Sequence, residues 1–394
     1  MATNFYIKLI VAILAIVPVM AVAAEDVTPA SEKKIAVSVS TLNTSDSAVM
    51  ATKPQDGERP VQPLNIHIGP SKLTLFGYAQ TQFDMTKTGD ETKNSFSMTR
   101  VILMANAELT RKLSFFLMID VASTQAPKHL HEYYAQYAFI PEFKVRVGQF
   151  KTPYTLENII SPTLLGTVNL NEGTRYMAGI AGDPLYGNYV GRDLGAMITG
   201  DAIKARDGHY FLNYSIGVFN GAGMNLRDNN NHKDVAAMLN VLPTKDITLS
   251  GSFIIGKGNA QADDMFGTIA QGTDYTRNRW SVGAEAKWKP LKLRTEYMGG
   301  KNGDIKNRAF YAELWCRLFR NFDVVLDYDY LDKNTSLSKD MREAMPAWTR
   351  TNNYLVGLQY WVYKACRIST QFIYSDRNIG PDTKSWLTQF QIAF

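Results

Sequence analysis

The sequence predicts an all-β protein, a transmembrane antiparallel β-barrel of about 16 strands. After residue 71 the chain consists of segments of about 9 to 14 residues in which apolar and polar side chains alternate, which is the period of a strand with two different faces. The connections between them are alternately very short and long, as in outer-membrane barrels. In lipid, an open sheet edge would leave backbone N–H and C=O groups unpaired, so we expect the sheet to close.

Composition narrows the class of protein. The chain has 394 residues, 45% of them hydrophobic and 20% charged, which is too apolar for a disordered polymer. Its 42 basic residues barely exceed its 37 acidic ones and are scattered, so we expect no nucleic-acid partner. The apolar run at the start is the only one long enough to suggest a helical span, which excludes a helical membrane bundle.

The N-terminal region divides into two parts before the barrel. Residues 1–24 carry one lysine, a short apolar stretch and closing alanines, the pattern of a signal peptide for export. Residues 25–71 are rich in Ser, Thr, Ala and Pro without a sustained period, and we expect a flexible leader. The barrel domain is predicted over 72–394. Cys316 and Cys366 are too few for a disulfide framework.

Sixteen strands are expected along the barrel domain. They are predicted at 72–84, 96–109, 112–122, 131–140, 142–150, 191–201, 208–220, 232–242, 246–257, 278–288, 291–300, 306–317, 320–331, 350–361, 364–376 and 384–394. An even number of strands places both ends of the barrel domain on one side of the membrane, which we expect to be the periplasmic side with the short turns.

Long connections are expected on the opposite side, at 85–95, 221–231, 258–277 and 332–349. The connection at 151–190 is longer still and is rich in Gly, Ser and Thr with few charges. Structureless loops of that length are uncommon in compact domains, so we expect part of it to fold into the barrel and narrow the pore. A surface loop that binds partners is the alternative.

Aromatic residues mark the predicted lipid-facing side. Trp280 and Trp288 share one strand face with small and apolar residues between them, and Tyr354 and Tyr360 repeat this pattern, as the two aromatic girdles of a membrane barrel require. The inner face of a soluble β-sandwich would produce the same alternation. The last strand favours the membrane barrel over the sandwich, because its C-terminal pattern resembles the insertion signal of outer-membrane barrels. The residues of that pattern are Phe390, Ile392 and Phe394.

The alternate positions would face the interior. They carry so many charged residues that a packed core is excluded and a water-filled lumen is favoured. Acidic residues there include Glu285, Glu296, Glu313, Asp327 and Asp329. The basic residues that we expect to line the pore and contact anions are Lys144, Arg146, Lys151, Arg279, Lys287, Lys292, Arg294 and Arg367.

Two stretches around the longest connection carry a family resemblance. RVGQFKTPYTLENIISP at 146–162 and GRDLGAMITG at 191–200, together with the C-terminus, resemble the phosphate-selective porin O and P family. The resemblance implies a trimeric outer-membrane porin of a Gram-negative cell, a pore narrowed by an infolded loop, and passive diffusion of small anions such as phosphate. In the family, inward arginines and lysines select phosphate. The acidic residues between them here interrupt such a ladder and favour a general or weakly selective channel for small hydrophilic solutes.

Enzymatic function is not indicated. No GxSxG elbow is present, and His129 and His131 are spaced poorly for zinc, so we expect no catalytic residues, metal or cofactor. A closed surface barrel that acts as an adhesin or receptor through its long loops is the alternative function. Ion conductance distinguishes the two, because a porin must conduct.

Overall fold

The computed structural model describes residues 64–394 apart from 69–70, 124–128, 188, 265–267 and 364. The predicted signal peptide and most of the predicted leader lie outside the described residues. Within the described part of the chain, no helix is long and apolar enough to cross a membrane.

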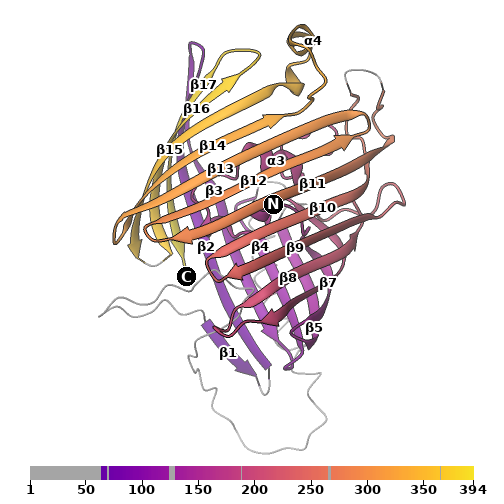
Figure 1. Ribbon diagram of the computed structural model, residues 1–394, viewed down its shortest axis with the longest axis vertical. Helices are drawn as coiled ribbons and strands as arrows, with labels where there is room; N and C mark the ends of the chain where they lie inside the picture. Colours follow the sequence, from indigo (N-terminus) through magenta and orange to yellow (C-terminus); the bar gives the residue numbers. More distant parts are fainter. Residues whose placement is uncertain (1–63, 69–70, 124–128, 188, 265–267, 364) are drawn as a thin grey trace, which may run out of the picture.

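Sixteen antiparallel strands, β2 to β17, form a closed barrel (Figure 1). Each strand pairs with the next one in sequence, and β17 pairs with β2 from Ala393↔Tyr78 to Thr383↔Thr88, which closes the sheet. Closure leaves no exposed edge between these strands, so the soluble sandwich is excluded. The strands are β2 (Ser71–Thr88), β3 (Glu91–Glu108), β4 (Leu113–Asp120), β5 (Leu130–Ile140), β6 (Phe143–Lys151), β7 (Arg192–Lys204), β8 (Tyr210–Phe219), β9 (Asp234–Thr244), β10 (Ile247–Asn259), β11 (Asp274–Trp288), β12 (Leu291–Asn302), β13 (Ile305–Phe319), β14 (Phe322–Asp332), β15 (Arg350–Tyr363), β16 (Cys366–Arg377) and β17 (Thr383–Ala393).

Each of the sixteen predicted segments coincides with one of these strands, but the predicted loop at 85–95 is wrong. β2 and β3 continue through most of it, pairing as far as Thr88↔Glu91, and only residues 89–90 form the turn. Gly89 has a φ of 57°, which suits a tight hairpin turn. The segment reads as a loop in sequence because its side chains are polar, yet the hydrogen-bonded backbone of the hairpin does not depend on apolar side chains.

A short strand, β1 (Leu64–Ile68), lies inside the predicted leader. It pairs antiparallel with the first residues of β2, from Leu64↔Leu75 to Ile68↔Ser71. Its partner residues on β2 precede Tyr78, where the pairing with β17 ends. β1 therefore covers a stretch of β2 that β17 does not reach, a pairing that no local pattern in the sequence indicates.

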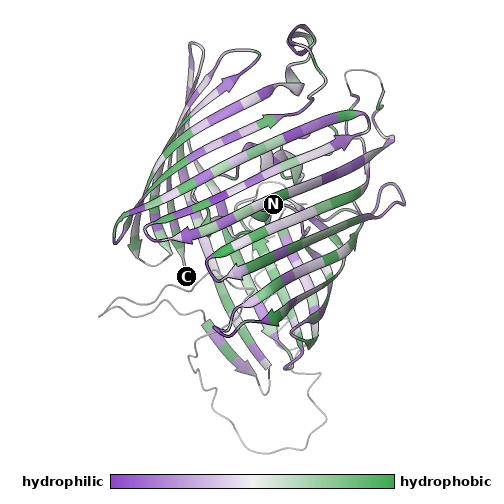
Figure 2. Ribbon diagram, viewed as in Figure 1, coloured by the Kyte–Doolittle hydropathy of each residue, from purple (hydrophilic) through white to green (hydrophobic). Residues whose placement is uncertain are grey.

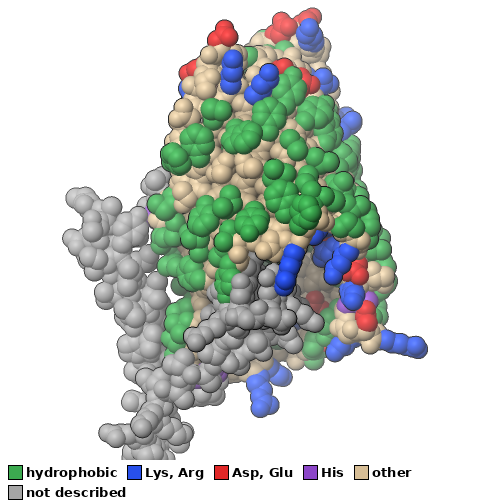
Figure 3. Space-filling view, turned by 90° about the vertical axis from the view of Figure 1, so that its left-hand side faces the viewer, with side chains coloured by type: hydrophobic (Ala, Val, Ile, Leu, Met, Phe, Trp, Pro, Cys, Tyr) green, Lys and Arg blue, Asp and Glu red, His purple; other side chains and the backbone are tan. Residues whose placement is uncertain are grey.

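The two faces of the wall differ as predicted. On β11, Trp280 and Val282 are 46% and 53% exposed, whereas Arg279 and Ser281 between them are 1% and 2% exposed. Hydrophobic and hydrophilic residues alternate along the strands (Figure 2), and apolar side chains cover much of the barrel's outer face (Figure 3). Phe390, Ile392 and Phe394 also lie on the exposed outer face. The apolar surface thus faces the surroundings, as it must in lipid.

The longer connections gather at the end of the barrel opposite to β1 and the C-terminus (Figure 1). The connection after β14 carries α4 (Lys339–Ala344) and η3 (Pro346–Trp348). The connection between β6 and β7 carries α2 (Leu156–Ile159), η2 (Pro162–Leu164) and α3 (Glu172–Met177). It differs from the others in its path, because α3 lies within the outline of the barrel (Figure 1).

Candidate functional site

The connection between β6 and β7 runs along the inner wall of the barrel. The backbone N–H of Leu156 donates to Oε1 of Glu296 on β12 at 2.8 Å, and that of Val168 donates to Oε1 of Gln371 on β16 at 2.8 Å. The contacts therefore reach strands that are distant in the sequence. We call residues 152–191 the inner loop.

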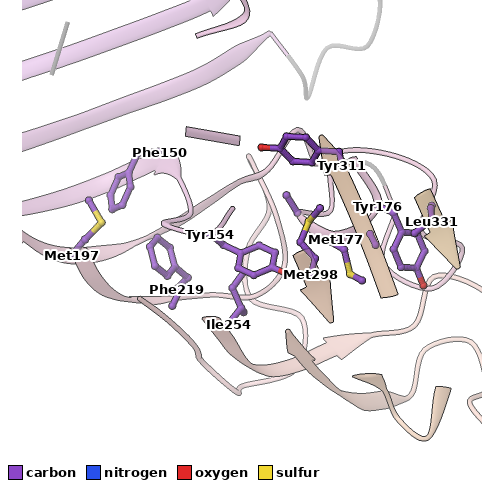
Figure 4. Close-up of a cluster of buried hydrophobic side chains, with 13 residues drawn as sticks. Phe150, Tyr154, Tyr176, Met177, Met197, Phe219, Ile254, Met298, Tyr311 and Leu331 are labelled. Atoms are coloured by element: carbon purple, nitrogen blue, oxygen red, sulfur yellow. The ribbon is translucent and has the colours of Figure 1, made fainter. Parts of the chain in front are cut away.

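Apolar side chains fasten the inner loop to the wall. Tyr154, Tyr176 and Met177 of the loop form one buried cluster with inward side chains of the strands (Figure 4). The strand residues in this cluster are Phe150, Met197, Ala236, Ile254, Met298, Ala309, Tyr311 and Leu331, with Phe219 at the end of β8. The sequence predicts a charged, water-filled lumen, but the inward positions in this cluster are not polar. They are apolar where the loop shields them from water.

Asp329 of β14 holds the start of α3. Its carboxylate accepts from the backbone N–H groups of Glu172 at 2.6 Å and Gly173 at 3.2 Å. Asn353 of β15 donates to both Asp329, at 3.0 Å, and the Glu172 side chain, at 3.2 Å. The first N–H groups of a helix lack partners within it, so this carboxylate both caps α3 and fixes its position.

Arg279 holds the end of α3. Its guanidinium donates to the carbonyl oxygens of Tyr176 and Met177, at 2.8 and 2.5 Å, and to Oδ2 of Asp183 at 2.6 Å. Both charged side chains of the Arg279–Asp183 ion pair are fully buried. Removal of one partner from such a pair would leave an unpaired buried charge, which typically costs about 3–5 kcal/mol.

A third attachment lies between α2 and α3. Arg367 of β16 donates to the carbonyl oxygen of Leu165 at 2.6 Å, and Gln371 donates to that of Gly166 at 2.9 Å. A Cβ atom on Gly166 would lie 2.1 Å from Glu313 and 2.2 Å from the Trp315 ring. The loop can press against the wall here only because residue 166 has no side chain.

The structure divides the eight basic residues predicted to contact anions into two groups. The first group binds the inner loop: Arg279 and Arg367 as described, and Lys151, whose Nζ donates to the carbonyl oxygen of Ile160 at 2.9 Å. Arg279 and Arg367 are only 1% and 2% exposed. Their charges are occupied in holding the loop.

The second group lies on the wall itself. Lys144 pairs with Asp201 at 2.8 Å, and Arg146 donates to Gln136 at 2.7 Å while stacking over the Tyr134 ring. Three other cations surround a single carboxylate, that of Glu285: Lys287 at 3.1 Å, Lys292 at 3.2 Å and Arg294 at 2.8 Å. Arg294 also reaches Glu313 at 3.4 Å. The Lys287 side chain is half exposed.

Three further cations were not among the predicted site residues: Arg100, Arg175 and Lys333. Arg175 of α3 is exposed, and its side chain has no hydrogen bond or ion pair among the described residues. Arg100 of β3 donates to Oε1 of Gln80 at 2.8 Å, and Nζ of Lys333, which follows β14, lies 5.9 Å from the centroid of the Tyr176 ring. Burial lowers the pKa of Lys333, and the neighbouring charges of Arg377 and Arg175 lower it further, against the opposite effect of Glu172 and Asp183.

The reason that sequence reasoning misses these cations differs from residue to residue. The parity of Arg100 places it toward the lumen, so the sequence does indicate its direction. Arg175 lies in a connection whose sequence has no periodicity, so no pattern indicates the direction of its side chain. Arg277, which stacks 3.7 Å over the Tyr186 ring of the inner loop, falls in the predicted loop at 258–277, although it shares the parity of Arg279. Extending the predicted strand at 278–288 by one residue would have found it.

No group of three or more metal-ligating side chains occurs among the described residues. The paired carboxylates Asp327 and Asp329 are part of the wall, and Asp329 binds backbone N–H groups of the loop. The interior is therefore a polar, strongly charged passage beside an anchored loop.

The sequence profile of "Phosphate-selective porin O and P" matches residues 74–385, which is almost the entire barrel. The chain belongs to the phosphate-selective porin O and P family. It is an outer-membrane porin that forms a channel through its sixteen-stranded barrel, and the adhesin alternative is not favoured. No curated protein sequence matches this porin.

Solved structures share the fold of this porin at low sequence identity. An anion-selective porin from Comamonas acidovorans matches with a TM-score of 0.60 at 13% identity, over 82% of this chain and 100% of that one. Pseudomonas putida OprB matches with a TM-score of 0.59 at 10% identity, over 82% and 94%. OmpT of Vibrio cholerae matches with a TM-score of 0.57 at 10% identity, over 84% and 100%. These likenesses confirm the barrel fold.

The anchoring of α3 by Asp329 can be tested by hydrogen exchange. We expect Asp329→Ala to speed exchange of the Glu172 and Gly173 amides more than tenfold, because each loses a bond to a charged group worth about 1.5–3 kcal/mol. Asp323→Ala is the matched control, since Asp323 lies inward on the same strand but binds Arg317 and Trp361 rather than the loop. Equal exchange at the two amides in both variants would contradict the anchoring role.

Proposed function

We propose that this porin conducts small hydrophilic solutes passively with a preference for anions, phosphate among them. The observation that carries the proposal is Arg175, an exposed cation on the inner loop whose side chain has no hydrogen bond or ion pair among the described residues. An exposed cation without a protein partner attracts anions and repels cations as they pass the loop. Its guanidinium supplies donors that replace water around a passing anion.

The cluster around Glu285 supports the same preference. Lys287, Lys292 and Arg294 outnumber the two carboxylates that they contact, Glu285 and Glu313. The surplus positive charge lies on β11 and β12, near the short turn at residues 289–290. A solute that has passed the inner loop would thus meet a second positive region before leaving the barrel.

We also propose that the inner loop is the constriction of the channel. Its support is the set of hydrogen bonds that hold it against β12, β14 and β16 inside the barrel. A barrel of about 16 strands encloses an aqueous lumen, and a loop fixed within it reduces the open cross-section.

Export and assembly complete the proposal. The N-terminal pattern at 1–24 supports export by a signal peptide, with membrane lipid and diffusing solutes as the partners of the mature chain. Among the similar solved structures, OmpT of Vibrio cholerae folded in vitro occurs in a trimer form. We propose a homotrimer for this porin as well.

Single-channel recording tests the constriction. We expect deletion of 160–182 to increase conductance in a planar bilayer, because the removed residues include η2 and α3, which occupy the lumen. Circular dichroism of the refolded variant establishes that the barrel has formed. A barrel with unchanged conductance would rule out the constriction.

The zero-current potential under a KCl gradient tests the ion preference. We expect anion preference in the native porin, block by added phosphate at fixed ionic strength, and a severalfold loss of anion preference in Arg175→Glu. Arg206→Glu is the control, because Arg206 is an exposed cation in the turn between β7 and β8. Weak selectivity without phosphate block would identify a general porin instead.

The oligomeric state is tested by native mass spectrometry of the refolded porin in detergent. We expect a mass of three chains. A single-chain mass over a wide range of protein concentrations would contradict the trimer.

A further inference from the structure

The outer surface of the barrel carries a groove that the channel function does not use. It has a volume of about 530 Å³ and lies across β10, β11, β12 and β13, and Thr335 of the connection after β14 also lines it. These strands cross the front of the barrel in Figure 1. The groove lies toward the end with the long loops, because Lys301 and Lys306 flank the turn between β12 and β13.

The floor of the groove is apolar and aromatic. Trp280 packs against Tyr297 with the ring centroids 5.6 Å apart, and Phe253 and Ile255 continue the surface on β10. Gly299 lies beside Trp280 in the register and contributes no side chain. A Cβ atom at residue 299 would lie 2.9 Å from the Trp280 ring. The hollow therefore exists because residue 299 is glycine.

The rim of the groove is cationic. Lys301 and Lys306 lie directly opposite each other on neighbouring strands, and Arg308 lies two residues further along β13, on the same face. All three are exposed, while Gly300 and Asn307 between them point inward. Among the described residues none of the three has a carboxylate partner. Asp332, which is opposite Arg308, is bound by Arg342 at 2.9 Å.

Like charges directly opposite each other destabilise a strand pair. Three cations are nevertheless held together at the boundary between an apolar surface and water, where an ammonium group next to hydrocarbon needs a counter-ion. A free phosphate would satisfy the cations but would leave the aromatic floor uncovered. An amphiphile with a phosphorylated head group satisfies both.

We propose that this groove binds a lipid with a phosphorylated head group from the membrane leaflet on the long-loop side, with its phosphate on Lys301, Lys306 and Arg308 and its acyl chains along Trp280 and Tyr297. The proposal does not depend on the ion preference of the channel. It requires only that the outer face of the barrel is in contact with lipid.

Lipid titration followed by native mass spectrometry tests the site. The whole porin is refolded into detergent without lipid and is titrated with diphosphorylated lipid A, with lipid A whose phosphates have been removed, and with inorganic phosphate. We expect one tightly bound diphosphorylated molecule per chain. Binding of the dephosphorylated lipid should be about 100-fold weaker, since each basic residue near an anionic lipid contributes roughly fivefold in affinity.

Two variants and a matched control locate the site. The triple variant Lys301→Gln, Lys306→Gln, Arg308→Gln should lose about 100-fold in affinity for the phosphorylated lipid. Gly299→Val, which fills the hollow but keeps every charge, should lose the bound lipid as well. The control is Lys112→Gln, Lys245→Gln, Arg320→Gln, which removes three exposed cations from the turns at the opposite end. It should bind as the native porin does, and channel conductance confirms folding in each case.

Four results would overturn the proposal. The first is equal binding of the phosphorylated and dephosphorylated lipids. The second is an equal loss of affinity in the control triple, which would indicate general charge attraction. The third is binding of inorganic phosphate as tight as that of the lipid. The fourth is a change in the number of associated chains in the triple variant without a loss of lipid, which would identify this face as a contact between copies of the chain.

Discussion

The backbone hydrogen bond imposes the constraint on which this structure depends. In a membrane every N–H and C=O group of a spanning segment needs a partner within the protein, and a sheet provides this only when it closes. The pairing of β17 with β2 supplies the last set of partners. Closure then requires one face of each strand to be apolar toward lipid, and it leaves the other face free to carry charge around an aqueous space.

The charged interior has two different tasks, and the structure separates them. Arg279, Arg367 and Asp329 bind backbone groups of the inner loop, so their charge is used to position it. Arg175 is carried by the positioned loop and remains exposed. Charge–backbone bonds suit the first task because a loop has backbone groups without secondary-structure partners, which polar side chains of the wall can satisfy.

On the outer face, too, neighbouring residues have different roles. Within the lipid-facing belt, one glycine creates a hollow beside Trp280, and three cations lie at its edge. The inner and outer features share strands: Arg279 of β11 holds α3 inside, while its neighbour Trp280 forms the floor of the groove outside. Because side chains alternate between the faces of a strand, one sequence segment can serve both surfaces independently.

The sequence by itself determined the fold class, the sixteen strands of the barrel and the direction of most wall residues, because strand periodicity and turn spacing are local properties of the chain. It did not predict β1, which pairs with residues of β2 that lie before the stretch paired with β17. It also did not predict that Arg279 and Arg367 would hold a loop whereas Arg175 would remain exposed. Parity fixes which face a side chain occupies, but the groups opposite it come from segments more than a hundred residues away, and only the closed barrel brings them together.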